Sequence, residues 1–199
     1  MAPDGVTRRN VLKSLSMGAV AGSVLRAIPL EAAEYAHGVI QAEKDDAGSG
    51  AYSPKFFTAH EYKTLQTLCE TILPADADCG GAIEAGAPEF IDLLTSENPD
   101  FQLRFGGGLM WLDSTCVNRY GNAYLDCTAQ QQKEILDLIA YRKNADEDEN
   151  LSYGVDFFSS LRNLTADGFF TSKIGIKYLG YEGNTFLVEF PGCPPVPGV

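Results

Sequence analysis

The fold is decided by a stretch that reads Thr58-Ala59-His60-Glu61-Tyr62-Lys63-Thr64-Leu65-Gln66-Thr67-Leu68-Cys69-Glu70-Thr71-Ile72-Leu73-Pro74. It opens with a capping box, because Thr58 can accept from the backbone N–H of Glu61 while the Glu61 side chain reaches back. Apolar side chains then recur at helical spacing, at Tyr62, Leu65, Leu68, Cys69 and Ile72. Pro74 cannot continue a helix. The stretch therefore predicts an amphipathic helix that ends before Pro74 and buries one face.

Similar patterns follow along the chain. Pro88 suits the first turn of a second helix, and another capping box begins at Thr128. Further helices are predicted over about residues 101–120 and 155–170. Their apolar positions include Phe90, Ile91, Leu93, Leu94, Ile135, Leu136, Leu138, Ile139, Phe157, Phe158, Leu161, Leu164 and Phe169. No strand pattern of convincing length occurs, so the sequence predicts an all-α protein, a compact helical bundle.

Three consecutive glycines, Gly106-Gly107-Gly108, interrupt the helix predicted over residues 101–120. Three glycines cost a helix about 2–3 kcal/mol of propensity. We expect the close approach of another helix to compensate for this cost.

The chain after Thr171 has no helical period and many turn residues. It is predicted to be an extended irregular C-terminal arm. Between Tyr178 and Phe190 it carries aromatic and aliphatic side chains that a coil cannot bury alone, so we expect the arm to lie on a partner. The expected interface residues are Phe169, Phe170, Tyr178, Tyr181, Phe186 and Cys193.

The N-terminus has the layout of a twin-arginine export signal, Thr7-Arg8-Arg9-Asn10-Val11-Leu12-Lys13. Arg8 and Arg9 would be read by the export machinery. The apolar stretch that follows is rich in Gly, Ala and Ser and contains Arg26. A membrane-spanning helix needs about 20 strongly apolar residues, so the stretch suits a signal better than an anchor. A merely basic N-terminal arm is the alternative.

The sequence allows more than one position for the end of the leader. Ala19-Val20-Ala21 has the small-x-small form of a cleavage site, and Ala32-Ala33 lies further on without the full pattern. Retention of the signal as an N-terminal helix is also open. We divide the chain into a leader helix over 1–36, a linker over 37–55 and a helical domain with its arm over 56–199.

Composition limits the classes of protein. The chain has 199 residues, of which 45% are hydrophobic, enough for one globular domain besides the leader. Its net charge of −12 repels phosphate backbones, so we expect no nucleic-acid partner.

The chain has five cysteines, an odd number. An exported chain meets an oxidising compartment, where disulfides persist. Two pairs, Cys69 with Cys79 and Cys116 with Cys127, could each close a local loop. Cys193 is left over in a Pro-rich tail, where an intermolecular bond and a free or buried thiol are both open.

Residues that could carry catalysis are scarce. The chain has only two histidines, His37 and His60, and no spacing typical of a zinc, haem or iron–sulfur site. It contains neither a phosphate-binding loop nor a dinucleotide-binding motif. The pair Asp76 and Asp78 lacks the other ligands of a calcium loop. We therefore expect no catalytic residue, metal or cofactor in this chain.

Several motifs occur in order between about residues 56 and 195: Leu68–Asp76, Gly81–Asp92, Gly108–Asp113, Gln130–Gln132, Leu164–Gly175, Lys177, Leu179–Tyr181, Gly183-Asn184 and Pro191–Pro194. Together they resemble the gluconate 2-dehydrogenase subunit 3 family. The resemblance implies a non-catalytic small subunit of a periplasmic dehydrogenase complex that is associated with the membrane.

In such a complex the large partner is typically a FAD-containing flavoprotein of the glucose–methanol–choline type that oxidises sugars or sugar acids, and a cytochrome c often accepts the electrons. The partner commonly lacks its own signal and is carried through the twin-arginine translocase by the small subunit. The resemblance makes Cys193 the expected intersubunit disulfide. Two other classes stay open: a self-standing periplasmic ligand-binding domain, and an oxidoreductase in its own right.

Overall fold

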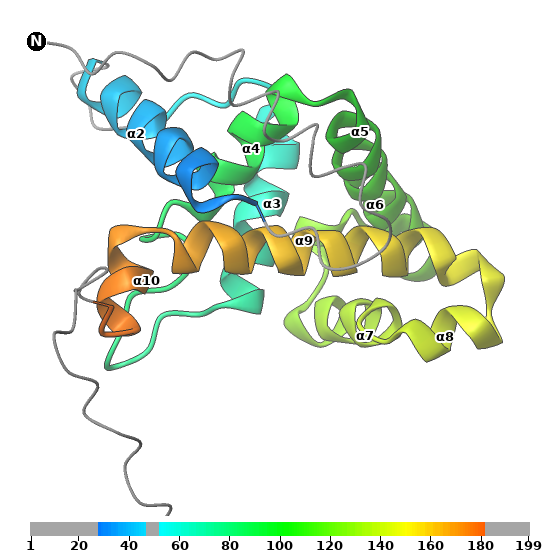
Figure 1. Ribbon diagram of the computed structural model, residues 1–199. Helices are drawn as coiled ribbons and strands as arrows, with labels where there is room; N and C mark the ends of the chain where they lie inside the picture. Colours follow the sequence, from blue (N-terminus) through cyan, green and yellow to red (C-terminus); the bar gives the residue numbers. More distant parts are fainter. Residues whose placement is uncertain (1–27, 47–51, 182–199) are drawn as a thin grey trace, which may run out of the picture.

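The structure, a computed structural model, describes residues 28–46 and 52–181. No strand and no helix long and apolar enough to cross a membrane occurs in these ranges. The all-α prediction is confirmed (Figure 1). In chain order the elements are α2 Leu30–Asp46, α3 Ala59–Ile72, α4 Ala87–Glu97, α5 Pro99–Phe101, the π-helix η1 Gln102–Gly106, α6 Gly107–Tyr120, the 3₁₀-helix η2 Tyr124–Asp126, α7 Ala129–Ile139, α8 Arg142–Glu147, the 3₁₀-helix η3 Glu149–Leu151, α9 Ser152–Phe170 and α10 Lys173–Tyr178.

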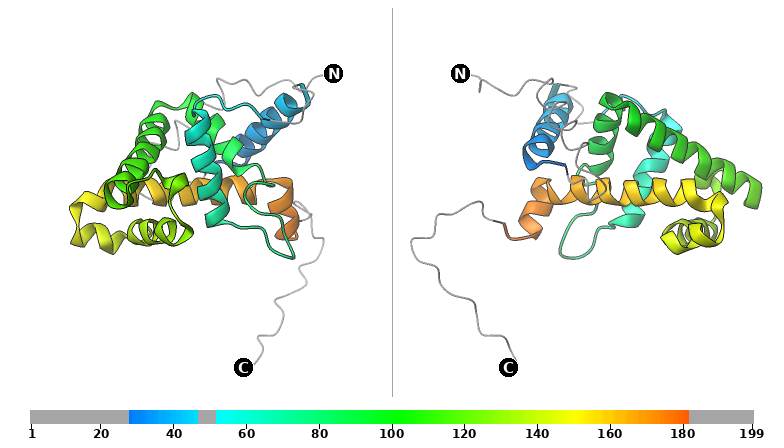
Figure 2. Two further views of the ribbon diagram at one scale, coloured as in Figure 1. Left: turned by 180° about the vertical axis from the view of Figure 1, so that it is seen from behind. Right: turned by 45° about the vertical axis from the view of Figure 1, so that its right-hand side comes forward.

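Helix α9 forms the axis of the bundle. Helices α3, α4, α6, α7, α8 and α10 all pack against it. In Figure 1, α2 and α4 lie on one side of α9 and α7 and α8 on the other. Seen from behind, α3 crosses α9 (Figure 2). The apolar side chains of α9 form part of the core, since Phe157 and Leu161 are no more than 1% exposed.

Both predicted capping boxes are confirmed, and they fix where two helices begin. The Thr58 N–H donates to Glu61 Oε2 at 2.9 Å, and the Glu61 N–H donates to Thr58 Oγ1 at 3.3 Å. At α7, the Thr128 N–H donates to Gln131 Oε1 at 2.9 Å, and the Gln131 N–H donates back at 3.3 Å. Each box satisfies backbone donors that a helix start otherwise leaves unpaired.

The glycine triplet lies where α6 meets α9, as expected from its cost in propensity. A Cβ added to Gly108 would lie 2.1 Å from the Phe157 ring, and one on Gly107 would lie 2.2 Å from the Tyr153 hydroxyl. The contact is reciprocal, because a Cβ on Gly154 of α9 would lie 2.3 Å from the Trp111 ring. In each helix, glycine at the contact lets an aromatic ring of the other helix approach the backbone.

The helix predicted over residues 101–120 is interrupted by the π-helix η1, which the sequence analysis did not anticipate. The Gly107 N–H donates to the carbonyls of both Arg104 and Leu103. The Leu103 carbonyl also accepts from the Tyr153 hydroxyl at 3.0 Å. Because a π-turn weakens the regular backbone ladder, this hydrogen bond from α9 supports the helix at its widened turn.

The segment that enters α3 is held by one buried carboxylate. Asp92 of α4 is 0% exposed. Its Oδ2 accepts from the Tyr52 hydroxyl at 2.8 Å and the Lys55 N–H at 2.7 Å, and its Oδ1 accepts from the N–H groups of Phe56 and Phe57 at 3.1 Å. Burial, and next the charge of Asp92, raise the pKa of Tyr52, so its phenol stays a donor.

Helix α2 differs from the predicted division of the chain. Residues 30–36 were expected within the leader and residues 37–46 within the linker, yet they form one continuous helix. Its buried face consists of small or aliphatic side chains, Ala32, Ala33, Ala36 and Ile40. Near its end, Lys44 Nζ lies 3.0 Å from Glu89 Oε1 of α4. Through this face α2 packs on α4.

Candidate functional site

The predicted interface residues fall into three groups. Phe169 is 5% exposed and belongs to the core, so its assignment to a partner surface is corrected. Phe170, Tyr178 and Tyr181 are 38%, 56% and 48% exposed. Phe186 and Cys193, like Arg8 and Arg9 of the leader, lie outside the described residues.

The predicted coil after Thr171 begins instead with a short helix, α10. Ser172 caps it: its Oγ accepts from the Gly175 N–H at 3.1 Å and donates to the Phe169 carbonyl at 2.7 Å. A Cβ on Gly175 would lie 2.1 Å from that same carbonyl oxygen, so only glycine lets α10 fold so closely onto the end of α9. Ser172 at the N-cap position is the sequence feature that could have predicted this helix.

Exposed apolar side chains lie at the last residue of α9 and at the C-terminal end of α10. We call this set the C-terminal patch: Phe170, Tyr178, Leu179 and Tyr181. Leu179 is 58% exposed and was not among the expected interface residues. Exposed aromatic and aliphatic side chains that gather in this way are typical of protein-binding surfaces.

Both ends of the described chain lie near this patch. The backbone of Ile28 hydrogen-bonds the Asp167 carboxylate in the last turns of α9. A few residues later, His37 Nε2 lies 3.0 Å from Thr171 Oγ1, and its ring stacks on Phe90 with centroids 5.2 Å apart. The stretch from Ile28 to His37 therefore contacts the C-terminal end of α9, where Phe170 of the patch lies.

His37 is half-buried at this junction, and desolvation lowers its pKa below the usual value of 6.5. The unfolded chain consequently binds the proton first as the pH falls. The stability that neutral His37 contributes is present above pH 6.5 and is lost as the pH falls from 6.5 through the lowered folded pKa.

We expect wild-type protein to lose more stability between pH 7 and pH 5 than His37→Gln, which cannot titrate. Urea unfolding at each pH measures the difference. Parallel pH profiles for the two proteins would contradict a neutral His37 in the folded state.

A second apolar surface lies on the outer face of η1 and α6. Leu103, Met110 and Val117 are 75%, 69% and 50% exposed, and they follow one another at intervals of seven residues. We call this set the α6 ridge. The sequence analysis missed it, although the seven-residue spacing of exposed apolar residues could have indicated it.

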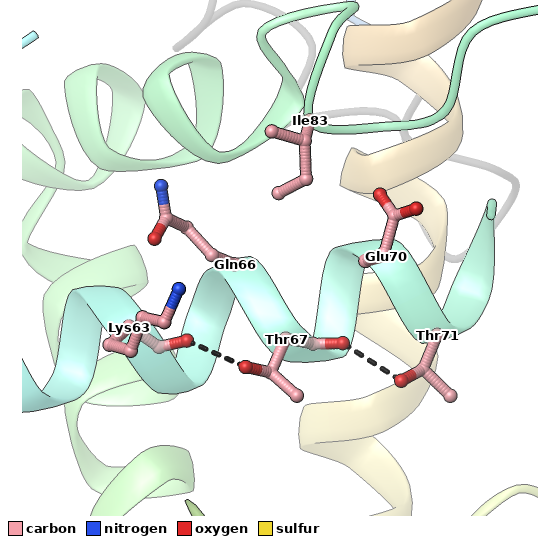
Figure 3. A pocket seen from close by; sticks show the side chains of 6 residues that line it. All are labelled: Lys63, Gln66, Thr67, Glu70, Thr71 and Ile83. Atoms are coloured by element: carbon pink, nitrogen blue, oxygen red, sulfur yellow. Dashed lines mark hydrogen bonds between the residues drawn. The ribbon is translucent and has the colours of Figure 1, made fainter. Parts of the chain in front are cut away.

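The described part of the chain offers shallow grooves. One, of about 370 Å³, lies between α3 and the loop before α4 and is lined by Lys63, Gln66, Thr67, Glu70, Thr71 and Ile83. Figure 3 shows Ile83 facing the α3 side chains across it. The hydroxyls of Thr67 and Thr71 donate to backbone carbonyls four residues earlier, at 3.0 and 2.8 Å. These groups are used within the helix, so the groove lacks an activated nucleophile.

The histidines and acids of the described segments form no metal site of three or more ligands. His60 Nε2 lies 2.7 Å from Asp113 Oδ2, and Asp113 Oδ1 accepts from the Tyr124 N–H at 2.9 Å. Asp113 therefore joins α3, α6 and η2, which is a structural role.

The four cysteines of the described part are free thiols. Cys69 points into the core, where its Sγ lies 3.5 Å from Thr165 Oγ1, whereas Cys79 lies in the loop after α3. The expected bridge between these two is therefore corrected, because Cys69 packs against α9 instead. Cys116 and Cys127 are both buried and lie together.

These features define an all-α protein with two exposed apolar surfaces on its described part. The model of the gluconate 2-dehydrogenase subunit 3 family matches residues 59–192. The chain belongs to this family, as the sequence motifs indicated. No curated protein and no solved structure matches the chain.

Proposed function

We propose that this chain is a non-catalytic accessory subunit that binds, stabilises and co-exports the FAD-dependent catalytic subunit of a sugar or sugar-acid dehydrogenase. The observation that carries the proposal is membership of a family named for one subunit of a dehydrogenase. The twin-arginine pattern at Arg8 and Arg9 supports export to the periplasm. The partner would belong to the glucose–methanol–choline type, and a cytochrome c would receive its electrons.

The packing of α2 supports a leader that can act while the domain is folded. Ala32 and Ala33 are 4% and 0% exposed within α2, so cleavage after Ala33 would cut a packed helix. Cleavage after Ala21 would leave α2 whole. The leader would thus extend from a folded domain that already holds its partner, and one signal would serve two chains.

Changing Arg8 and Arg9 to lysine tests whether this chain carries the flavoprotein through export. We expect both this chain and the co-expressed flavoprotein to stay in the cytoplasm, because the translocase reads the arginine pair. Fractionation with immunoblotting measures both chains, and flavin absorbance identifies the partner. Normal export of both chains from the double variant would refute this role, while retention of this chain alone would show that the partner travels independently.

The C-terminal patch is our candidate for the partner contact. Tyr178→Ser with Leu179→Ser should weaken co-purification of the flavoprotein by roughly 10–30-fold, the effect of losing apolar anchors from an interface. Tyr141→Ser is the matched control, since Tyr141 is exposed to a similar extent, 59%, but lies between α7 and α8. If Leu103→Ser with Met110→Ser abolishes co-purification and the patch variant does not, the contact lies on the α6 ridge instead.

A further inference from the structure

The end of α6 turns back on itself and brings two distant cysteines together. Gly121 ends the helix in the left-handed region at φ 81°, with its N–H donating to the Val117 carbonyl at 2.9 Å. The chain then forms η2, whose Tyr124 N–H donates to Asp113 Oδ1 at 2.9 Å. Because Asp113 belongs to α6, this hydrogen bond fixes η2 against the helix that carries Cys116.

Both thiols lie inside this turn. Cys116 is 0% exposed and Cys127 is 7% exposed. The Cys127 thiol donates to the Asn122 carbonyl at 3.6 Å. Burial, and next the neighbouring Cys127 thiol, raise the pKa of Cys116. Tyr124, which is 0% exposed, lies near both thiols.

We infer that Cys116 and Cys127 form an intrachain disulfide once the chain meets a disulfide oxidant. The location of that event rests on the proposed export, since the periplasm supplies such oxidants and the cytoplasm does not. The pairing itself rests only on the geometry of α6 and η2. The disulfide would tie the end of α6 to the start of α7.

The chemistry is thiol–disulfide exchange with a disulfide oxidant, either a protein oxidoreductase or oxidised glutathione. The thiolate of Cys127, the more accessible of the two, attacks the oxidant disulfide and releases one oxidant thiol. Cys116 then loses its proton and attacks the Cys127 sulfur, which releases the second oxidant thiol. Two protein thiols are oxidised and one oxidant disulfide is reduced to two thiols.

Peptide mapping tests the pairing directly on the purified full chain. The reduced protein is incubated with oxidised glutathione, its remaining thiols are alkylated, and it is digested with trypsin. Arg119 lies between the two cysteines, so cleavage there separates them into peptides 105–119 and 120–133. We expect mass spectrometry to find these two peptides cross-linked, and the cross-link to disappear on reduction.

Cys79→Ser is the matched control and should leave the cross-link intact. Cys116→Ser should abolish it and leave Cys127 open to alkylation or glutathionylation. The oxidised wild type should melt about 6–12 °C above the reduced form, a difference that Cys116→Ser lacks. Recovery of both wild-type peptides separately after oxidation, or either cysteine cross-linked elsewhere, would overturn the inference. None of these results depends on export, so failure of the proposed function would be seen separately.

Discussion

Replacing Asp92 with alanine is expected to lower the free energy of unfolding by about 3–4 kcal/mol. The reason is that one fully buried carboxylate accepts four hydrogen bonds from residues 52–57. Without it, backbone N–H groups at the entry to α3 lose their acceptors, and each unsatisfied buried donor costs about 1–3 kcal/mol. Urea unfolding followed by circular dichroism measures the loss.

Two variants make this result specific to the buried carboxylate. Asp92→Asn keeps the volume and one acceptor oxygen, so it should fall between wild type and Asp92→Ala. Asp137→Asn removes an acid whose side chain is 59% exposed and should change stability by less than about 1 kcal/mol. An Asp92→Ala protein as stable as Asp137→Asn would mean that water replaces the carboxylate at no cost.

Gly108→Ala is expected to destabilise the protein by about 2–3 kcal/mol, although alanine favours helices by up to about 1 kcal/mol over glycine. The added Cβ would lie 2.1 Å from the Phe157 ring, which is 1% exposed. The packing between α6 and α9 must open to admit it. Thermal and urea unfolding would both report the loss.

Gly38→Ala is the matched control within the same protein. Gly38 lies in the middle of α2, and a Cβ there meets nothing within 4 Å, so alanine should be neutral or stabilising. Adding Phe157→Ala to Gly108→Ala should cost less than the sum of the two single changes, because the small residue removes the clash. Additive effects would show that the two residues do not oppose each other across the interface.

The helices that were predicted correctly are indicated by residues that lie close together in the sequence. The capping boxes at Thr58 and Thr128 place two helix starts through residues three positions apart. Helix α9 has apolar residues at helical spacing along its length. The glycine triplet indicated a close contact with another helix, because three glycines lower helix propensity and this loss needs compensation. The family motifs needed only the sequence. Phe170, Tyr178 and Tyr181 are exposed, and their place in an interface stays a prediction.

The elements that were missed depend on contacts between distant residues. Helix α2 has a weak apolar face of alanines and is stabilised by docking on α4. The π-helix η1 depends on Tyr153, which lies 50 residues from the carbonyl it supports. Phe169 continues the buried face of α9 four residues after Thr165, whereas Phe170, one position further on, is 38% exposed. The role of Asp92 likewise follows from tertiary packing.

The contact between His37 and Thr171 has a consequence for the order of events during synthesis. Its two residues are 134 positions apart. Helix α2 leaves the ribosome early and can pack on α4 in mid-translation, but its contact with Thr171 can form only near the end of translation. The packing of the first described helix is therefore completed late. In the export that we propose, a signal that precedes α2 would be joined to a completed domain only when almost the whole chain has been made, which would couple the timing of export to completion of the fold.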